Sequence, residues 1–131
     1  MKKSSVKTIN LSKYYNSIKV LKNISIDLPK NAIIGILGKN GAGKTTLLAM
    51  LMGLITPTKG DIFIFEKSLD EHKYDILKII NFQSPYVELP KKMTVFQNLV
   101  FYARLYNVEN YDLKISKLSS DLKISSLLEK K

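Results

Sequence analysis

The nine residues GKNGAGKTT, at positions 38–46, follow directly on the apolar run AIIGIL at 32–37. An apolar run without alternation is typical of a strand buried on both faces, as in a mostly parallel sheet covered by helices. The segment KTTLLAMLMGL at 44–54 carries leucines at the three- and four-residue spacing of a packed helix. The glycine-rich residues are therefore expected to form a loop between a buried strand and a helix, which places the chain in the α/β class.

The loop fits the pattern G-x-x-x-x-G-K-T, with Gly38, Gly43, Lys44 and Thr45 at the fixed positions. Glycines adopt backbone angles that other residues avoid, so successive N–H groups can turn towards phosphate oxygens. The helix that comes next adds its N-terminal dipole to the same anion. We expect the Lys44 ammonium between the β- and γ-phosphates, the Thr45 hydroxyl on a magnesium ion, and Thr46 on an inner phosphate. The pattern predicts Mg-nucleotide binding.

The length and composition limit the number of domains, the cysteine chemistry and the cellular location that the chain can have. With 131 residues, the chain has room for one domain or for a piece of a larger one. The absence of cysteine excludes disulfides and thiolate metal sites. No apolar run is long enough to cross a bilayer, and the N-terminus lacks the apolar region of a signal peptide, so a cytoplasmic location is expected.

The formal charge of +10 comes almost wholly from scattered lysines, and Arg104 is the only arginine. Phosphate and guanine recognition in nucleic acids usually recruits arginine for its bidentate fork. We interpret the lysines as a solvated surface and expect no nucleic-acid partner. A membrane-bound partner would tolerate this charge.

Periodicity outlines the other elements. Alternation predicts a half-exposed strand at 6–15, in which Thr8 and Leu11 lie on opposite faces. Helices are expected from Met93 onward, the first of them capped by Thr94. The remaining expectations are a half-exposed strand at 20–28, a turn at 55–61, a strand at 61–67, a helix running into a strand at 72–82, and a loop at 84–92.

One continuous stretch resembles the N-terminal part of an ATP-binding-cassette (ABC) ATPase, the nucleotide-binding subunit of ABC transporters. It reads LSKYYNSIKVLKNISIDLPKNAIIGILGKNGAGKTTLLAMLMGLITPTKGDIFIF, and its segments match in this order. In that family an antiparallel strand pair carrying an aromatic residue precedes the loop. A turn with the positions of Gly53, Pro57 and Gly60 comes after the helix. The later segment MTVFQNLVFYARLYNV resembles the opening of the family's helical subdomain. The resemblance covers essentially the whole chain.

The resemblance implies a P-loop NTPase (RecA-like) core with an N-terminal antiparallel β subdomain and the start of an α-helical subdomain, incomplete at the C-terminus. Residues 1–131 would form a partial ABC ATPase domain. Residues 1–92 would hold the β subdomain and the P-loop part of the core, and residues 93–131 would begin the helical subdomain.

The resemblance also implies roles for particular residues. Tyr15 matches the aromatic residue that stacks on adenine, although a slip of one residue would give this role to Tyr14. A glutamine that senses the γ-phosphate and magnesium is expected near Gln83, but the spacing leaves Ser84 as the alternative. The residues that match phosphate-binding positions are Asn40, Gly41, Ala42, Gly43, Lys44, Thr45 and Thr46.

Several parts of the family's hydrolytic machinery do not occur in these residues. The family uses an aspartate–glutamate pair after an apolar strand, a later histidine, and a glycine-rich signature resembling LSGGQ. Glu66 comes after an apolar strand too early and is expected on the surface, as is His72. LSSD at 118–121 lacks glycines, so we expect Leu118 in the core and Ser119–Ser120 in solvent.

These features imply Mg-ATP binding and, in the complete domain, ATP hydrolysis coupled to export of a substrate across the membrane. The implied partners are a transmembrane permease subunit and a second ABC ATPase domain, which would hold the protein at the inner face of the cell membrane. Two alternatives stay open: an ATP-binding module without turnover because of truncation, and a soluble ABC ATPase acting on ribosomes or DNA. We also expect the isolated chain to expose apolar surface and to be prone to aggregation.

Overall fold

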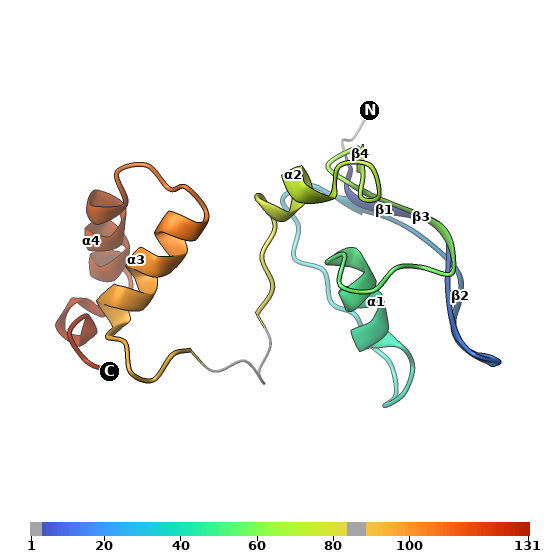
Figure 1. The fold of residues 1–131 in the computed structure, drawn as a ribbon, viewed down its shortest axis with the longest axis horizontal. Coiled ribbons are helices and arrows are strands. Elements are labelled where there is room, and N and C mark those ends of the chain that lie inside the picture. Colours follow the sequence, from blue (N-terminus) through green and yellow to red (C-terminus); the bar gives the residue numbers. More distant parts are fainter. Residues whose placement is uncertain (1–3, 84–88) are drawn as a thin grey trace. The chain divides into compact units, whose positions relative to one another are not determined.

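The structure, a computed structural model, describes residues 4–83 and 89–131 (Figure 1). The chain divides into two compact units, residues 1–82 and residues 83–131. Within the described residues, the first unit contains the strands and the glycine-rich loop, and the second contains helices. The expected subdomain boundary at residue 92 stays a prediction.

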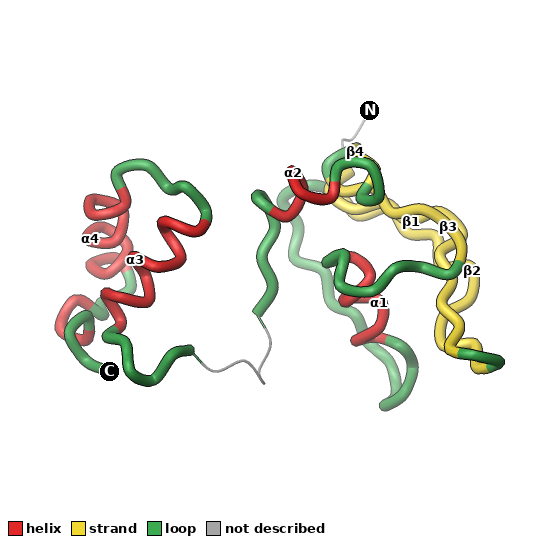
Figure 2. Tube along the Cα trace, viewed as in Figure 1, coloured by secondary structure: helices red, strands yellow, loops and turns green. Residues whose placement is uncertain are grey.

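The first unit is built on one antiparallel sheet with the strand order β2-β1-β3-β4 (Figure 2). A two-residue turn joins the first two strands, and its Asn16 has the positive φ of 53° that such hairpin turns need. The predicted strands at 6–15 and 20–28 are present with shifted ends, and the strand predicted at 61–67 is present only as far as Ile64, where a turn at 65–66 interrupts it. Their observed bounds are β1 Ser4–Tyr15, β2 Ile18–Pro29, β3 Lys59–Ile64 and β4 Lys67–Ser68.

The alternation predicted for β1 is interrupted by a bulge. Thr8 is 2% exposed and Leu11 is 0% exposed, so both are buried although alternation placed them on opposite faces. The register with β2 shifts between these two residues, and Asn10 between them has a φ of 48°. An extra residue in a strand moves the later side chains to the opposite face, which explains why the predicted alternation is wrong here.

Gly60, at the start of β3, fits against this bulge. Its φ of 84° lies in the left-handed region. A Cβ atom at this position would collide with the carbonyl oxygen of Ile9 and the backbone of Asn10. Both the backbone angle and the close approach therefore require glycine.

Helix α1, Lys44–Leu51, packs its apolar side chains with those of the sheet. The helix predicted at 44–54 is present over its first eight residues. It ends before Gly53, whose φ of 65° is the left-handed conformation common at helix C-termini. The buried cluster of this unit consists of Leu11, Leu21, Leu47, Met50, Leu51, Ile62, Ile64, Leu69 and Ile76.

The buried strand predicted at 32–37 does not form. These residues have no strand assignment, and Figure 2 draws them as loop. The side chains of Ile33 and Leu37 are 104% and 95% exposed. A strand needs a neighbouring strand to pair its N–H and C=O groups. Among the described residues no strand pairs with this run, so the prediction is wrong for this structure.

The segment 72–82 departs from its prediction for the same reason. Helix α2 spans Lys73–Leu77 and buries Ile76 completely, which confirms the helical part. Residues 78–82 form no strand, and Phe82 is 45% exposed. No described strand lies beside them to complete a ladder.

The second unit contains α3, Val95–Leu105, α4, Tyr111–Asp121, and the short 3-10 helix η1, Ser125–Leu127. The predicted cap at Thr94 is confirmed. The Thr94 hydroxyl accepts a hydrogen bond of 3.1 Å from the Gln97 N–H, and the Gln97 carboxamide oxygen accepts one of 2.9 Å from the Thr94 N–H. This reciprocal pair is a capping box.

Helix α4 buries a different face from the one expected. Leu118 is 46% exposed, whereas Ser119 is 1% exposed and its hydroxyl donates a 2.7 Å bond to the carbonyl of Ile115. Ile115 and Ser119 are one helical turn apart and share the buried face. The predictions for Leu118 and Ser119 are therefore wrong, because packing against α3 and η1 selects a face that residue type alone does not reveal.

Arg104 on α3 and Tyr111 on α4 link the two helices. The guanidinium lies 5.8 Å from the centre of the Tyr111 ring and donates a 3.3 Å hydrogen bond to the hydroxyl. This hydrogen bond raises the pKa of Arg104 above its usual value.

Candidate nucleotide-binding site

The glycine-rich loop leads directly into helix α1. Gly41 and Gly43 have φ angles of 81° and 85°, both in the left-handed region that favours glycine. The Ala42 N–H donates a 3.2 Å bond to the Lys39 carbonyl, which closes a turn inside the loop. Gly43 is the N-cap residue of α1. Gly43 is a fixed position of the sequence pattern and Gly41 is not, whereas Gly38, the other fixed glycine, does not have a positive φ.

Gly43 also allows the loop to pack closely against strand β2. A Cβ atom there would lie 2.9 Å from Leu21 Cδ2 and 3.0 Å from the Val20 carbonyl oxygen. At Gly41, by contrast, a Cβ atom would meet nothing within 4 Å. The end of the loop is thus held by the sheet, while its tip is open to solvent.

Lys44 contacts its own loop. Its ammonium donates a 2.7 Å hydrogen bond to the Gly38 carbonyl and a 2.8 Å bond to the Lys39 carbonyl. Thr45 is exposed and Thr46 is half-buried. The lysine therefore stabilises the curvature of the loop, and the Thr45 hydroxyl remains accessible.

The N-terminus of α1 can accept an anion. No side chain in the described parts of the chain caps it, and its first turn holds no acidic residue. The first N–H groups of a helix lack partners within the helix and carry the positive end of its dipole. Beside them lie the Lys44 ammonium and the exposed residues Asn40, Gly41 and Ala42. This arrangement fits the phosphates of a nucleotide.

Tyr15 is the last residue of β1 and is 44% exposed, whereas Tyr14 is half-buried and its N–H donates to the Thr58 hydroxyl at 3.1 Å. Of the two alternatives, Tyr15 therefore offers more ring surface to a base. Tyr15 pairs with Ile18 at the start of β2. Only three residues further along β2, Leu21 contacts the Gly43 position. A span of three strand residues is about 10 Å, so the residue paired with Tyr15 lies about this far along β2 from the residue that contacts the loop.

Lys13 is a neighbour of Tyr15 that sequence reasoning missed. Its ammonium lies 5.1 Å from the centre of the Tyr15 ring, within the range of a cation–π contact. The same ammonium donates a 2.7 Å bond to the carbonyl of Thr56. A lysine two residues before an aromatic residue in a strand points to the same face, and this spacing was the available signal.

Gln83 is exposed and belongs to the second unit. Its proposed contact with magnesium and the γ-phosphate therefore stays a prediction. Ser84, the alternative, lies outside the described residues.

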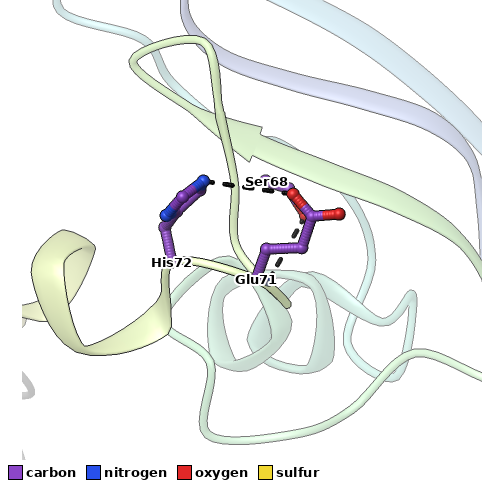
Figure 3. Close-up of polar contacts among 3 residues, drawn as sticks. All are labelled: Ser68, Glu71 and His72. Carbon is purple, nitrogen blue, oxygen red and sulfur yellow. Dashed lines mark hydrogen bonds and ion pairs between the residues drawn. The ribbon is translucent and has the colours of Figure 1, made fainter.

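His72 and Glu66, which were not assigned catalytic roles, lie on the surface. Figure 3 shows His72 beside Glu71 and Ser68. The His72 Nε2 atom is 4.0 Å from a Glu71 carboxylate oxygen, and both side chains are largely exposed. Glu66 is also exposed, in the turn between β3 and β4. The expectations for His72 and Glu66 are confirmed.

Two kinds of feature do not occur within residues 4–83 and 89–131. No group of three or more histidine, aspartate, glutamate or cysteine side chains could hold a metal ion there. No helix in these ranges has the length and apolar character needed to cross a bilayer.

Comparison with known proteins connects this loop to a family. The model of the family described as "ABC transporter" matches residues 21–131. The chain belongs to the ABC transporter family. The family match covers the glycine-rich loop, α1 and everything after them, together with most of β2. The predicted family membership is confirmed.

Curated relatives within the ABC transporter family are longer than this chain. It is 39% identical over 106 residues to the bacitracin transport ATP-binding protein BcrA of Bacillus licheniformis, a match that covers 79% of this chain and 34% of the relative. It is 36% identical over 126 residues to the energy-coupling factor transporter ATP-binding protein EcfA of Aster yellows witches'-broom phytoplasma, covering 92% and 46%. The chain thus spans a third to a half of these two relatives.

Solved structures confirm the fold class. One described as the ATP binding subunit of an ABC transporter matches with a TM-score of 0.84 at 21% identity, covering 96% of this chain and 53% of that one. The cbiO1 protein of Clostridium perfringens matches with a TM-score of 0.80 at 26% identity, covering 98% and 54%. The antiparallel sheet and the helices are therefore part of an ABC ATPase domain.

Proposed function

We propose that this chain binds Mg-ATP through residues 38–46 at the N-terminus of α1. One observation supports this most directly. The uncapped first turn of α1, the left-handed Gly41 and Gly43, and the Lys44 ammonium all lie within one short loop. Partly charged N–H groups beside a full positive charge attract the negatively charged phosphates of a nucleotide.

Each residue of the loop has a role in this proposal. The backbone N–H groups of 40–43 surround the phosphate oxygens, and Lys44 neutralises the β- and γ-phosphates. The Thr45 hydroxyl ligates magnesium, and Thr46 donates to an inner phosphate. Tyr15 stacks on the adenine, since its ring is partly exposed at the end of β1. Gln83 is the proposed sensor of the γ-phosphate and magnesium.

In the complete protein, we propose ATP hydrolysis coupled to transport across a membrane. Support comes from the relatives, which are named as ATP-binding proteins of transporters, and from cbiO1, which is described as part of the complex cbiONQ. A permease subunit and a second ATP-binding domain are the proposed partners, and they would hold the protein at the inner face of the membrane.

Export is the proposed direction of transport. It rests on the likeness of two segments, SPYVELP at 84–90 and ARLYN at 103–107, to exporter-type ATPases. Residues 84–88 of the first segment lie outside the described residues. Several relatives are named as import ATP-binding proteins, including CysA of Pseudomonas syringae and PotA of Fusobacterium nucleatum. Transport assays in vesicles with the whole protein and its permease would decide the direction, and ATP-driven accumulation on the side where ATP is hydrolysed would reject export.

Binding without turnover is the proposal for residues 1–131 taken alone. The aspartate–glutamate pair and the glycine-rich signature that the family uses for hydrolysis are not among these residues. Phosphate release above background that Lys44→Ala abolishes would contradict this.

The binding proposal is tested on the 131-residue chain with a fluorescent ATP analogue followed by anisotropy. Lys44→Ala is expected to weaken Mg-ATP binding by about tenfold to hundredfold, the range for a lost hydrogen bond to a charged group. Lys39→Ala is the matched control, because it removes an equal charge from the same loop while keeping the carbonyl that accepts from Lys44. Equal losses in both variants would reduce the site to general electrostatic attraction and reject the proposal.

A further inference from the structure

The ammonium of Lys13 is held at two points. It lies 5.1 Å from the centre of the Tyr15 ring, and it donates a 2.7 Å hydrogen bond to the Thr56 carbonyl. A lysine on a protein surface normally keeps its ammonium in water, and ordering a long side chain costs conformational entropy. The hydrogen bond to the Thr56 carbonyl therefore maintains the position of the ammonium over the ring.

The turn that provides this carbonyl is itself fastened to β1. The Tyr14 N–H donates to the Thr58 hydroxyl at 3.1 Å, and the Thr58 N–H donates to the Ser12 carbonyl at 2.9 Å. With the bond from Lys13 to Thr56, three hydrogen bonds join residues 12–14 to residues 56–58. The same turn comes after helix α1, whose N-terminus carries the phosphate-binding loop. The end of β1 is thus tied to the segment that follows the C-terminus of α1.

We propose that Lys13 is a positioning residue for the adenine base, which holds the Tyr15 ring by one face and leaves the other face for stacking. This inference rests on the proposed function, in which Tyr15 stacks on the base. The ammonium is bound to the Thr56 carbonyl, so it remains against one face of the ring. Lys13 acts through Tyr15 and does not contact the nucleotide.

Holding the Tyr15 ring in place would lower the entropic cost of binding the adenine base. A flexible side chain at a binding site loses conformational freedom when the ligand immobilises it. A ring that is already held by a cation loses less freedom when the base arrives. The strength of an exposed cation–π contact corresponds to a roughly two- to fivefold change in affinity.

The test compares Mg-ATP with Mg-tripolyphosphate, which has phosphates but no base. Affinities of the 131-residue chain are measured by competition against a fluorescent ATP analogue. Lys13→Met removes the cation, and Lys13→Arg keeps it. Lys19→Met is the matched control, since Lys19 pairs with Tyr14 on the adjacent strand and its loss changes the net charge equally.

Lys13→Met is expected to weaken Mg-ATP binding roughly two- to fivefold and to leave Mg-tripolyphosphate binding unchanged. Lys13→Arg and Lys19→Met should bind both ligands as the original chain does. Retained tripolyphosphate binding also shows that the variant is folded. In a Tyr15→Ala background, Lys13→Met should have no further effect, because its role passes through the ring.

Four results would overturn the inference: an equal loss for both ligands, an effect that persists in the Tyr15→Ala background, tighter ATP binding by Lys13→Met, or unchanged ATP binding by Lys13→Met where Tyr15→Ala weakens it. The third would mean that the lysine obstructs the stacking face. Failure of the proposed function would give a different result in the same binding assay. In that case Tyr15→Ala and Lys44→Ala would themselves leave Mg-ATP binding unchanged.

Discussion

The ammonium of Lys44 lies 2.7 Å from the carbonyl oxygen of Gly38, six residues earlier in the chain. The first and last parts of the glycine-rich loop are therefore joined by a charge-assisted hydrogen bond. Such bonds stabilise more than neutral ones. Lys44 thus has a structural role in the loop in addition to the phosphate contact proposed for it.

Replacing Lys44 should loosen the loop even when nucleotide is not added. Lys44→Met is expected to speed amide exchange of Ala42, whose N–H closes the turn on Lys39, by about tenfold. Hydrogen exchange measured by NMR reports this rate. Lys39→Met is the control and should exchange at the original rate. An unchanged rate in Lys44→Met would mean that the glycines alone set the curvature.

The hydroxyl of Thr45 should matter only when magnesium is present. Thr45→Val is expected to abolish the increase in ATP affinity that magnesium produces, because the hydroxyl is proposed to contact the metal and not the phosphates. Binding measured in EDTA should stay within about twofold of the original chain. Titrations with and without Mg²⁺ measure the difference, and Thr45→Ser should restore it. A loss of similar size in EDTA would place the hydroxyl on a phosphate instead.

The contact of Gly60 with the bulge in β1 predicts a large effect on stability. Gly60→Ala should lower the free energy of unfolding by about 2–4 kcal/mol, since it combines a left-handed φ with a collision against backbone. Urea denaturation monitored by circular dichroism measures this change. Gly35→Ala is the control, because a Cβ atom there meets nothing within 4 Å, and it should stay within about 0.5 kcal/mol. Equal stability of both variants would show that β3 can shift away from the bulge.

The exposed apolar residues of the segment 32–37 should govern solubility. The double variant Ile33→Lys with Leu37→Lys is expected to reduce aggregation, measured by light scattering, because it removes exposed apolar surface. It should change the free energy of unfolding by less than about 0.5 kcal/mol, since both side chains are almost fully exposed. Ile62→Lys, at a position only 5% exposed, should unfold the first unit. A double variant that unfolds as readily as Ile62→Lys would mean that the segment is packed in solution.

Features encoded within a few neighbouring residues were predictable. The left-handed angles at Gly41 and Gly43, the start of α1 at Lys44 and the cap at Thr94 all result from residue type and spacing. Glycine tolerates positive φ, and a threonine before a helix accepts from its first turn, whatever surrounds them. The family resemblance came from the order of such local segments.

Features that need a partner distant in the sequence were not predictable in this way. The run 32–37 has the composition of a buried strand, but a strand forms only beside another one, and none of the described strands pairs with it. The bulge near Asn10 depends on how β1 meets both of its neighbours. The cation over Tyr15 depends on the Thr56 carbonyl, from a turn 43 residues beyond Lys13 in the chain. Local spacing specifies which conformations a segment favours, whereas contacts between segments determine which side chains are buried, paired or exposed.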